Sequence, residues 1–156
     1  MLRPPRGLCL LLLVLASANI ARSTVVGDDW QFIFNVAIGI LALAIGITSG
    51  QSLSELGLDT SSLKRGLNHG AVPFAIISAI MIVLGLVGVL NDDRTDVSLL
   101  QMLLRVLVVI PIGTVLVEEI AFRGTLDALL RKSFGDGIRS LVLGAVIFGA
   151  WHVFPT

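Results

Sequence analysis

Two groups of side chains that could do chemistry lie inside otherwise apolar stretches of the chain. Glu118, Glu119 and Arg123 have the spacing E-E-x-x-x-R, and Phe148 and His152 have the spacing F-x-x-x-H. A carboxylate that faces an imidazole in a pocket of low dielectric can hold a water molecule and accept its proton, because desolvation makes the carboxylate a stronger base. The pattern therefore indicates activation of a water molecule, provided that the two groups meet in the fold.

Helical spacing determines which of these side chains can pair. Residues four positions apart lie on the same face of a helix, so Glu119 can form an ion pair with Arg123. Phe148 and His152 likewise present a ring and an imidazole on one face. Glu118 points about 100° away from Glu119 and remains available to a group on another helix.

The composition is that of a membrane protein. Of 156 residues, 55% are hydrophobic and 14% are charged, and the mean hydropathy of +0.95 is far above that of a soluble domain. The 11 basic residues balance the 11 acidic ones, so we expect no nucleic-acid partner. The single cysteine, Cys9, cannot form an internal disulfide.

Four apolar stretches are long enough to cross a hydrocarbon core of about 30 Å at about 1.5 Å per residue. They are residues 30–48, 71–90, about 99–122 and 140–154. Lipid offers backbone groups no water, and the alternation of a barrel is missing, so these stretches must be helices. With the apolar segment 1–22, the sequence predicts an all-α polytopic membrane bundle of about four to five transmembrane helices.

The N-terminal segment 1–22 has two interpretations. Its basic residues, short apolar run and the stretch Ala16-Ser17-Ala18 fit a cleaved signal peptide, whereas many multi-span proteins begin with such a segment as a first transmembrane helix. Either way, the distribution of basic residues places the connections after residues 48 and 130 inside, with a cytoplasmic N-terminus if the segment is retained. We expect a multi-pass protein of the plasma membrane. The segments assigned to the inside carry Arg3, Arg6, Lys64, Arg65, Arg131, Lys132 and Arg139, and those outside carry Arg22 and Arg94.

The connection 49–70 is too polar to span the membrane. Its spaced leucines suggest that part of it lies along the inner surface as an amphipathic helix, where Lys64 and Arg65 would meet lipid phosphates. His69 is expected to be a surface or interface histidine, because no second ligand-type residue lies near it in sequence.

Glu118 and His152 are predicted to reach the same depth in the membrane. The helix continues past Glu118 to Lys132, and the stretch SFGDG makes a turn before the next apolar run. Glu118 precedes Gly135 by as many residues as His152 follows it, so two antiparallel helices would bring them together about 20 Å from the inner turn. The alternative is that the helix has reached the headgroups by Glu118 and that its charges lie in water. Pro111 either kinks this helix and opens water access or serves packing alone.

These residues resemble the motifs of a known family, the CPBP intramembrane proteases. That family includes the type II CAAX prenyl endopeptidases, bacteriocin-processing and self-immunity proteins and the Abi proteins. The two spacings match its E-E-x-x-x-R and F-x-x-x-H motifs in the family's order, and SLSELGLDTSSLKRGLNHG is similar to the segment that often precedes the core of bacterial members. The resemblance begins near Ser52, and residues 98–156 correspond to a partial protease core.

The resemblance implies an endopeptidase that cleaves a membrane-associated or prenylated peptide or protein. Carried over, Glu118 and His152 would be catalytic and activate the water, and Glu119, Arg123 and Phe148 would support the site. One histidine and two glutamates without H-E-x-x-H argue only weakly for zinc or another divalent metal, so no metal ligand is assigned.

The chain departs from the family pattern after His152. Later helices of the family carry a further histidine, followed four residues on by Asn or Asp, which are thought to stabilise the oxyanion; this sequence ends at Thr156. Loss of oxyanion donors typically costs about 10²-fold or more in rate. We therefore expect a fragment, a truncated product or part of a longer reading frame. The competing hypothesis is a catalytically inactive scaffold, immunity or transporter-type membrane protein, in which the pair of Glu119 and Arg123 locks helices together.

Overall fold

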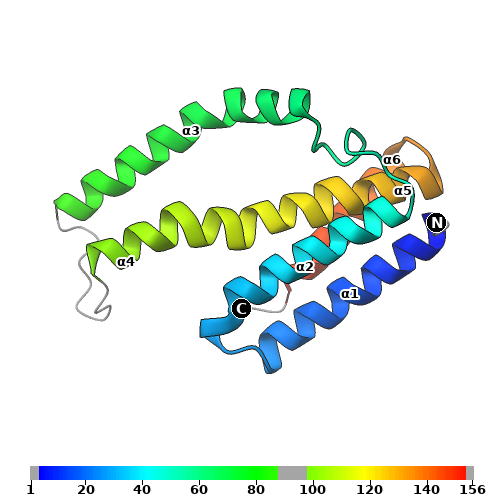
Figure 1. Ribbon diagram of the computed structural model, residues 1–156, viewed down its shortest axis with the longest axis horizontal. Coiled ribbons are helices and arrows are strands. Elements are labelled where there is room, and N and C mark those ends of the chain that lie inside the picture. The colour runs from blue at the N-terminus through cyan, green and yellow to red at the C-terminus, as the bar shows by residue number, and fades with distance from the viewer. Residues whose placement is uncertain (1–3, 88–97, 154–156) are drawn as a thin grey trace.

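The described part of the chain is built from helices alone. The computed structural model describes residues 4–87 and 98–153, which form α1 (Pro4–Thr24), α2 (Asp28–Thr48), α3 (Thr60–Leu86), one long helix and α6 (Ile138–Trp151) (Figure 1). In these ranges, four helices are long and apolar enough to cross a membrane, and α6 is a shorter apolar helix. The predicted all-α polytopic bundle is confirmed.

The long helix covers residues 99–134 and carries the first motif. It consists of α4 (Leu99–Leu104), η1 (Arg105–Val109), η2 (Pro111–Leu116), η3 (Glu119–Leu126) and α5 (Asp127–Phe134). The three η segments are π-helical, with turns wider than those of an α-helix. Pro111, which has no N–H to donate, is the first residue of η2.

The turn after the long helix lies where the sequence predicts it. Helix α5 ends at Phe134 and α6 begins at Ile138. Gly135 between them has φ +85°, a conformation that L side chains rarely adopt, so a glycine is required there. The long helix and α6 therefore form the expected antiparallel hairpin.

The core lies between α1, α2, the second half of the long helix and α6. Side chains of α1 pack against α2 and α5, so the N-terminal segment is an integral part of this core. Lys132 donates to the backbone oxygen of Gly50 at 3.1 Å, which places the α2–α3 connection and the α5–α6 turn at one end of the bundle. The buried core residues are Leu8, Leu11, Leu15, Ala18, Ala42, Ile45, Ala121, Phe122, Leu126, Leu129, Leu130 and Trp151.

Glycines let α2 approach the long helix closely. A Cβ added to Gly39 would lie 3.2 Å from a methyl group of Val117, and one added to Gly113 would lie 2.6 Å from the ring of Phe32. Small residues at helix interfaces allow close van der Waals packing, which is a main source of helix association in lipid. This packing fixes the part of the long helix next to Glu118.

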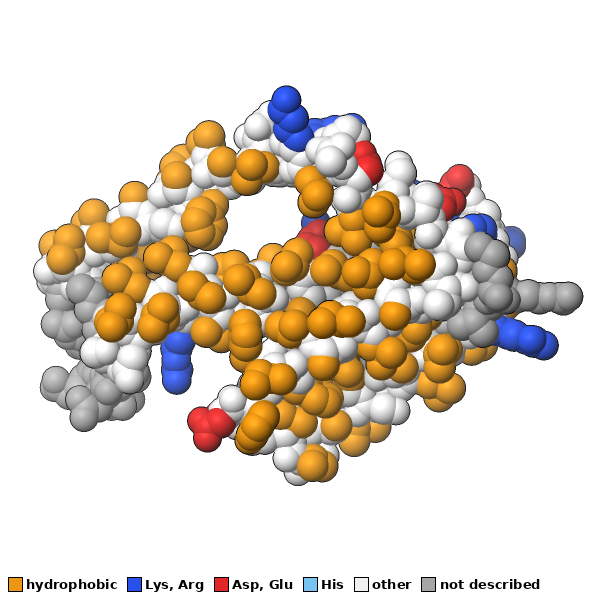
Figure 2. Space-filling model, viewed as in Figure 1, with side chains coloured by type: hydrophobic (Ala, Val, Ile, Leu, Met, Phe, Trp, Pro, Cys, Tyr) orange, Lys and Arg blue, Asp and Glu red, His pale blue; other side chains and the backbone are white. Residues whose placement is uncertain are grey.

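Helix α3 lies apart from the core. In the described residues it has no buried side chain, and Figure 1 shows it as a separate arm beside the long helix. The molecular surface in Figure 2 is largely apolar over both, as expected of a surface that faces lipid. Residues 88–90 of the expected third span and the outer segment with Arg94 lie outside the described residues.

Helix α3 begins at Thr60, well before the start at Ala71 that hydropathy suggests. The carboxylate of Asp59 caps it, accepting hydrogen bonds from the amides of Ser61 and Ser62 and from the Ser61 hydroxyl. The hydrogen bonds from these two serines lower the pKa of Asp59 to about 2. The polar first turns of α3 therefore continue directly into the apolar helix, and the connection before them is a series of turns.

Candidate active site

Glu118 and His152 meet between the long helix and the end of α6. His152 Nε2 lies 3.6 Å from Glu118 Oε1. The neighbouring Trp151 donates its indole Nε1–H to the same oxygen at 3.3 Å. Both His152 and Trp151 of the second helix therefore contact the Glu118 carboxylate of the first. Glu118 and His152 meet because they are equally far from Gly135 along the chain. Helix α6 has 14 residues, so the site lies about 20 Å along the hairpin from its turn.

The contacts of the imidazole determine where its proton lies. Nδ1 of His152 is 2.9 Å from the backbone oxygen of Phe148. A carbonyl oxygen only accepts hydrogen bonds, so Nδ1 carries a hydrogen in this arrangement. Nε2, which faces Glu118, is then an acceptor in the neutral ring and a donor in the imidazolium. Glu118 and His152 attract each other when one proton lies between Oε1 and Nε2. This holds for a carboxylate beside an imidazolium and for a carboxylic acid beside a neutral imidazole.

An aromatic cluster holds the two motifs in register. The ring of Phe122 lies edge-on to Phe148 with centroids 5.2 Å apart, and 5.5 Å from the ring of Trp151. Phe148 in turn lies 4.6 Å from the His152 ring. Phe122 is four residues after Glu118 and is buried, so it places the face of the long helix that carries Glu118 against α6. Because Phe122 lies four residues after Glu118, helical spacing alone could have predicted that it belongs to the site.

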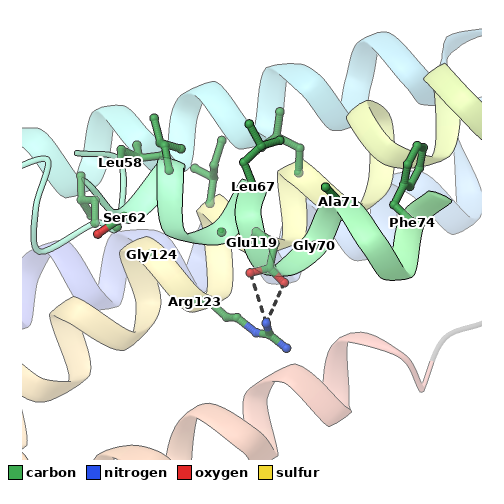
Figure 3. Close-up of a pocket in the computed structure, with 15 residues that line it drawn as sticks. Leu58, Ser62, Leu67, Gly70, Ala71, Phe74, Glu119, Arg123 and Gly124 are labelled. Atoms are coloured by element: carbon green, nitrogen blue, oxygen red, sulfur yellow. Dashed lines mark hydrogen bonds and ion pairs between the residues drawn. The ribbon is translucent and has the colours of Figure 1, made fainter. Parts of the chain in front are cut away.

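Glu119 and Arg123 form the predicted pair on another face of the long helix. Arg123 Nη1 lies 3.1 Å from Glu119 Oε1, and both side chains line the cavity shown in Figure 3, together with Leu67 and Gly70 of α3. In the part of the chain that the structure describes, the ion pair and hydrogen bonds of these two side chains are with each other. The pair therefore neutralises charge within the long helix.

Two residues of α1 that the sequence did not single out reach the site. Asn19 is buried and donates its Nδ2 to the backbone oxygen of Trp151 at 2.7 Å. The guanidinium carbon of Arg22 lies 5.4 Å from the centroid of the Trp151 ring, in a cation–π arrangement. A polar residue in an apolar helix was the available signal, but its partner could not be identified from local sequence.

A cavity of about 330 Å³ lies between the long helix and α6, beside the carboxylate of Glu118. Apolar side chains such as Val115, Leu141 and Phe148 line much of it. A larger cavity of about 680 Å³ lies on the α3 side and is shown in Figure 3. Glu119 and Arg123 border both cavities. The site therefore lies next to two cavities, one on the α6 side and one on the α3 side.

The described residues do not fit a zinc site. Catalytic zinc takes about three protein ligands, usually from His, Cys, Asp or Glu. Within residues 4–87 and 98–153, such residues nowhere form a group of three, and Glu118 and His152 are the two that meet at the site. We therefore assign no metal ligand among the described residues.

The C-terminal part of the chain matches a known protein family. Residues 96–156 match the family model described as "Type II CAAX prenyl endopeptidase Rce1-like". This match confirms the resemblance to the CPBP intramembrane proteases over the part of the chain that contains both motif helices. Neither a curated protein nor a solved structure matches the chain. The fold and this match together define a multi-pass membrane protein with a CAAX-protease-like hairpin, and α1, α2 and α3 lie outside the matched residues.

Proposed function

We propose that this protein is an intramembrane endopeptidase of the CPBP type, which cleaves a membrane-associated or prenylated peptide. The observation that carries the proposal is the 3.6 Å approach of His152 Nε2 to Glu118 Oε1, with each residue supplied by a different motif helix. An isolated carboxylate at this depth would cost about 2.5 to 3.5 kcal/mol on the insertion scale. Placing it beside an imidazole and an indole N–H offsets this cost and makes it available for chemistry.

In the proposed reaction, Glu118 acts as the general base. It accepts a proton from a water molecule, and the water oxygen attacks the carbonyl carbon of the peptide bond. The resulting tetrahedral intermediate collapses when the protonated Glu118 returns the proton to the amide nitrogen and the C–N bond breaks. The products are a carboxylic acid and an amine, and the proton taken from the water ends on the leaving amine.

Trp151 and His152 have different roles beside Glu118 in this reaction. Trp151 holds Oε1 with its indole N–H, so we assign Oε2 as the oxygen that binds the water. His152, with Nδ1 held by the Phe148 carbonyl, presents Nε2 to the same space. As an imidazolium, it would donate to the developing oxyanion, and as a neutral ring it would share the proton of Glu118. Preorganised donors of this kind stabilise charge as it forms.

The membrane setting of the site follows from the fold and the charges. We place the N-terminus, the α2–α3 connection and the α5–α6 turn on the cytoplasmic side of the plasma membrane, because basic residues are concentrated there. The contact between Lys132 and Gly50 supports a common side for the two connections. The candidate site then lies about 20 Å from that side, and the apolar cavity beside it would receive substrate from the bilayer.

The proposal is tested by cleavage of a prenylated peptide by the full protein in phospholipid vesicles. We expect Glu118→Gln to lower kcat by about 10²-fold or more, because general-base catalysis contributes roughly 10² to 10⁴-fold. Glu119→Gln makes the same chemical change one residue away and should reduce kcat much less. If Glu118→Gln cleaves as fast as the unmodified protein, the mechanism is wrong. If the unmodified protein does not cleave and both variants fold equally well, the inactive scaffold becomes the better hypothesis.

A further inference from the structure

Helix α1 contacts the candidate site through Trp151. Trp151 is the last residue of α6, and its backbone oxygen is among the carbonyls that a helix end leaves without an intrahelical partner. Asn19 Nδ2 donates to this oxygen at 2.7 Å, and both residues are buried. The contact joins residues far apart in the chain and holds the end of α6 against α1.

Arg22 acts on the side chain of the same tryptophan. Its guanidinium lies over the indole ring, 5.4 Å from the centroid. A positive charge is also favourable near a helix C-terminus, where the α6 dipole ends. Asn19 and Arg22 are three residues apart and thus lie on one face of α1. One face of α1 therefore fixes both the backbone and the ring of Trp151.

The ring position of Trp151 decides where the Glu118 carboxylate lies. Its Nε1–H is the donor to Oε1, at 3.3 Å, and its ring also contacts Phe122, with centroids 5.5 Å apart. If Asn19 and Arg22 no longer hold Trp151, the indole ring can rotate away from Glu118. Glu118 then keeps its approach to His152, but its carboxylate loses the hydrogen bond from Nε1–H that fixes Oε1.

We infer that Asn19 and Arg22 are positioning residues for Glu118 and that they act through Trp151. This inference rests on the proposed function. The inference gives α1 a part in the enzyme. It therefore requires that segment 1–22 is a retained transmembrane helix and not a cleaved signal peptide. Because α1 lies outside the residues matched by the family model, the contribution belongs to this chain's own N-terminal part.

The experiment uses the two tryptophans of the chain as a probe. Trp30 is exposed, so Trp30→Phe leaves Trp151 as the single emitting residue with little effect on the fold. In this background, Asn19→Leu removes the amide donor, Arg22→Gln removes the charge, and Arg22→Lys retains it. Ser23→Ala is the matched control, because the Ser23 hydroxyl donates to the Ile20 carbonyl within α1.

We expect Asn19→Leu and Arg22→Gln to shift the Trp151 emission and to lower kcat about ten- to a hundredfold with KM unchanged, the range for a misplaced reacting group. Arg22→Lys should retain most of kcat, and Ser23→Ala should change neither quantity. If Asn19→Leu does not fold, the inference is tested by Arg22→Gln.

The outcomes separate this inference from the proposed function. If Glu118→Gln abolishes cleavage while Arg22→Gln keeps full kcat, the positioning role is wrong and the proposed function stands. If Glu118→Gln keeps full cleavage, the proposed function is wrong and the positioning role falls with it. In that case the emission still reports on the contact: an unchanged spectrum in both Asn19→Leu and Arg22→Gln would show that α1 does not hold Trp151 at all.

Discussion

Removing Arg123 should destabilise the protein more than removing Arg123 and Glu119 together. The two side chains form an ion pair of 3.1 Å on a face of the long helix that borders the gap to α3. Arg123→Met keeps the apolar stem of the side chain but leaves the carboxylate of Glu119 without its partner. Glu119→Gln in the same molecule removes that unpaired charge, so it should restore part of the lost stability.

The size of this coupling can be worked out from the geometry. Two charges 3.1 Å apart attract by about 5 kcal/mol at an effective dielectric constant of about 20. Ordering two long side chains costs about 1.5 to 2 kcal/mol each. The net coupling is therefore about 1 to 2 kcal/mol, whereas an ion pair in water contributes about 0.2 to 1 kcal/mol. The Arg123 side chain is largely exposed and the Glu119 side chain is about half exposed, so the medium in the gap sets the strength of the coupling.

The assay is a double-mutant cycle on the free energy of unfolding in lipid bilayers, with Glu119→Gln, Arg123→Met and the double variant. Asp127→Asn and Arg131→Met provide a control cycle, because this pair has the same helical spacing near the α5–α6 turn, where water is available. We expect a larger coupling for Glu119 and Arg123 than for the control pair. A coupling below about 0.5 kcal/mol would refute the view that the pair stabilises a charged helix face within the bilayer.

Three further predictions concern the scaffold. In a thermal unfolding assay, Gly113→Ala should lower the free energy of unfolding by about 1 to 3 kcal/mol, because its Cβ would lie 2.6 Å from the Phe32 ring. Gly149→Ala has open space around its Cβ and should be nearly neutral in the same assay. Asp59→Ala should weaken the start of α3 in hydrogen exchange, and Asp59→Asn should preserve much of it. Because the folded-state pKa of Asp59 is lowered to about 2, its contribution should be complete above about pH 4 and be lost as the pH falls through 2; constant protection down to pH 1.5 would contradict this. The mature protein should retain α1 by mass spectrometry, and an N-terminus at Asn19 would contradict its part in the core.

The sequence was sufficient to predict the elements whose signals are local. Apolar runs of membrane-spanning length identified the helices, and the glycine-containing stretch after Phe134 identified the hairpin turn. The equal distances of Glu118 and His152 from Gly135 then predicted that the two side chains lie at one depth, and the structure places them 3.6 Å apart. Antiparallel helices joined by a short turn have little freedom in register, which is why this inference was possible.

Other features depend on packing between segments that no local pattern relates. Asn19 and Trp151 are 132 positions apart, and their hydrogen bond forms because α1 packs against α6 and α5. The start of α3 at Thr60 was missed because hydropathy reports where a helix becomes apolar, whereas the Asp59 cap decides where it begins. The role of Trp151 was missed because its indole N–H reaches Glu118 only once the hairpin has formed.

The contact between Glu118 and His152 in the bilayer is tested most directly by ¹⁵N NMR of the His152 ring in lipid vesicles. The chain has two histidines, so His69→Gln leaves a single imidazole signal. We predict that Nδ1 keeps its hydrogen, and that Glu118→Gln changes the Nε2 shift while Glu119→Gln does not. An Nε2 signal that is the same with and without the Glu118 carboxylate would show that the two groups do not meet in the membrane.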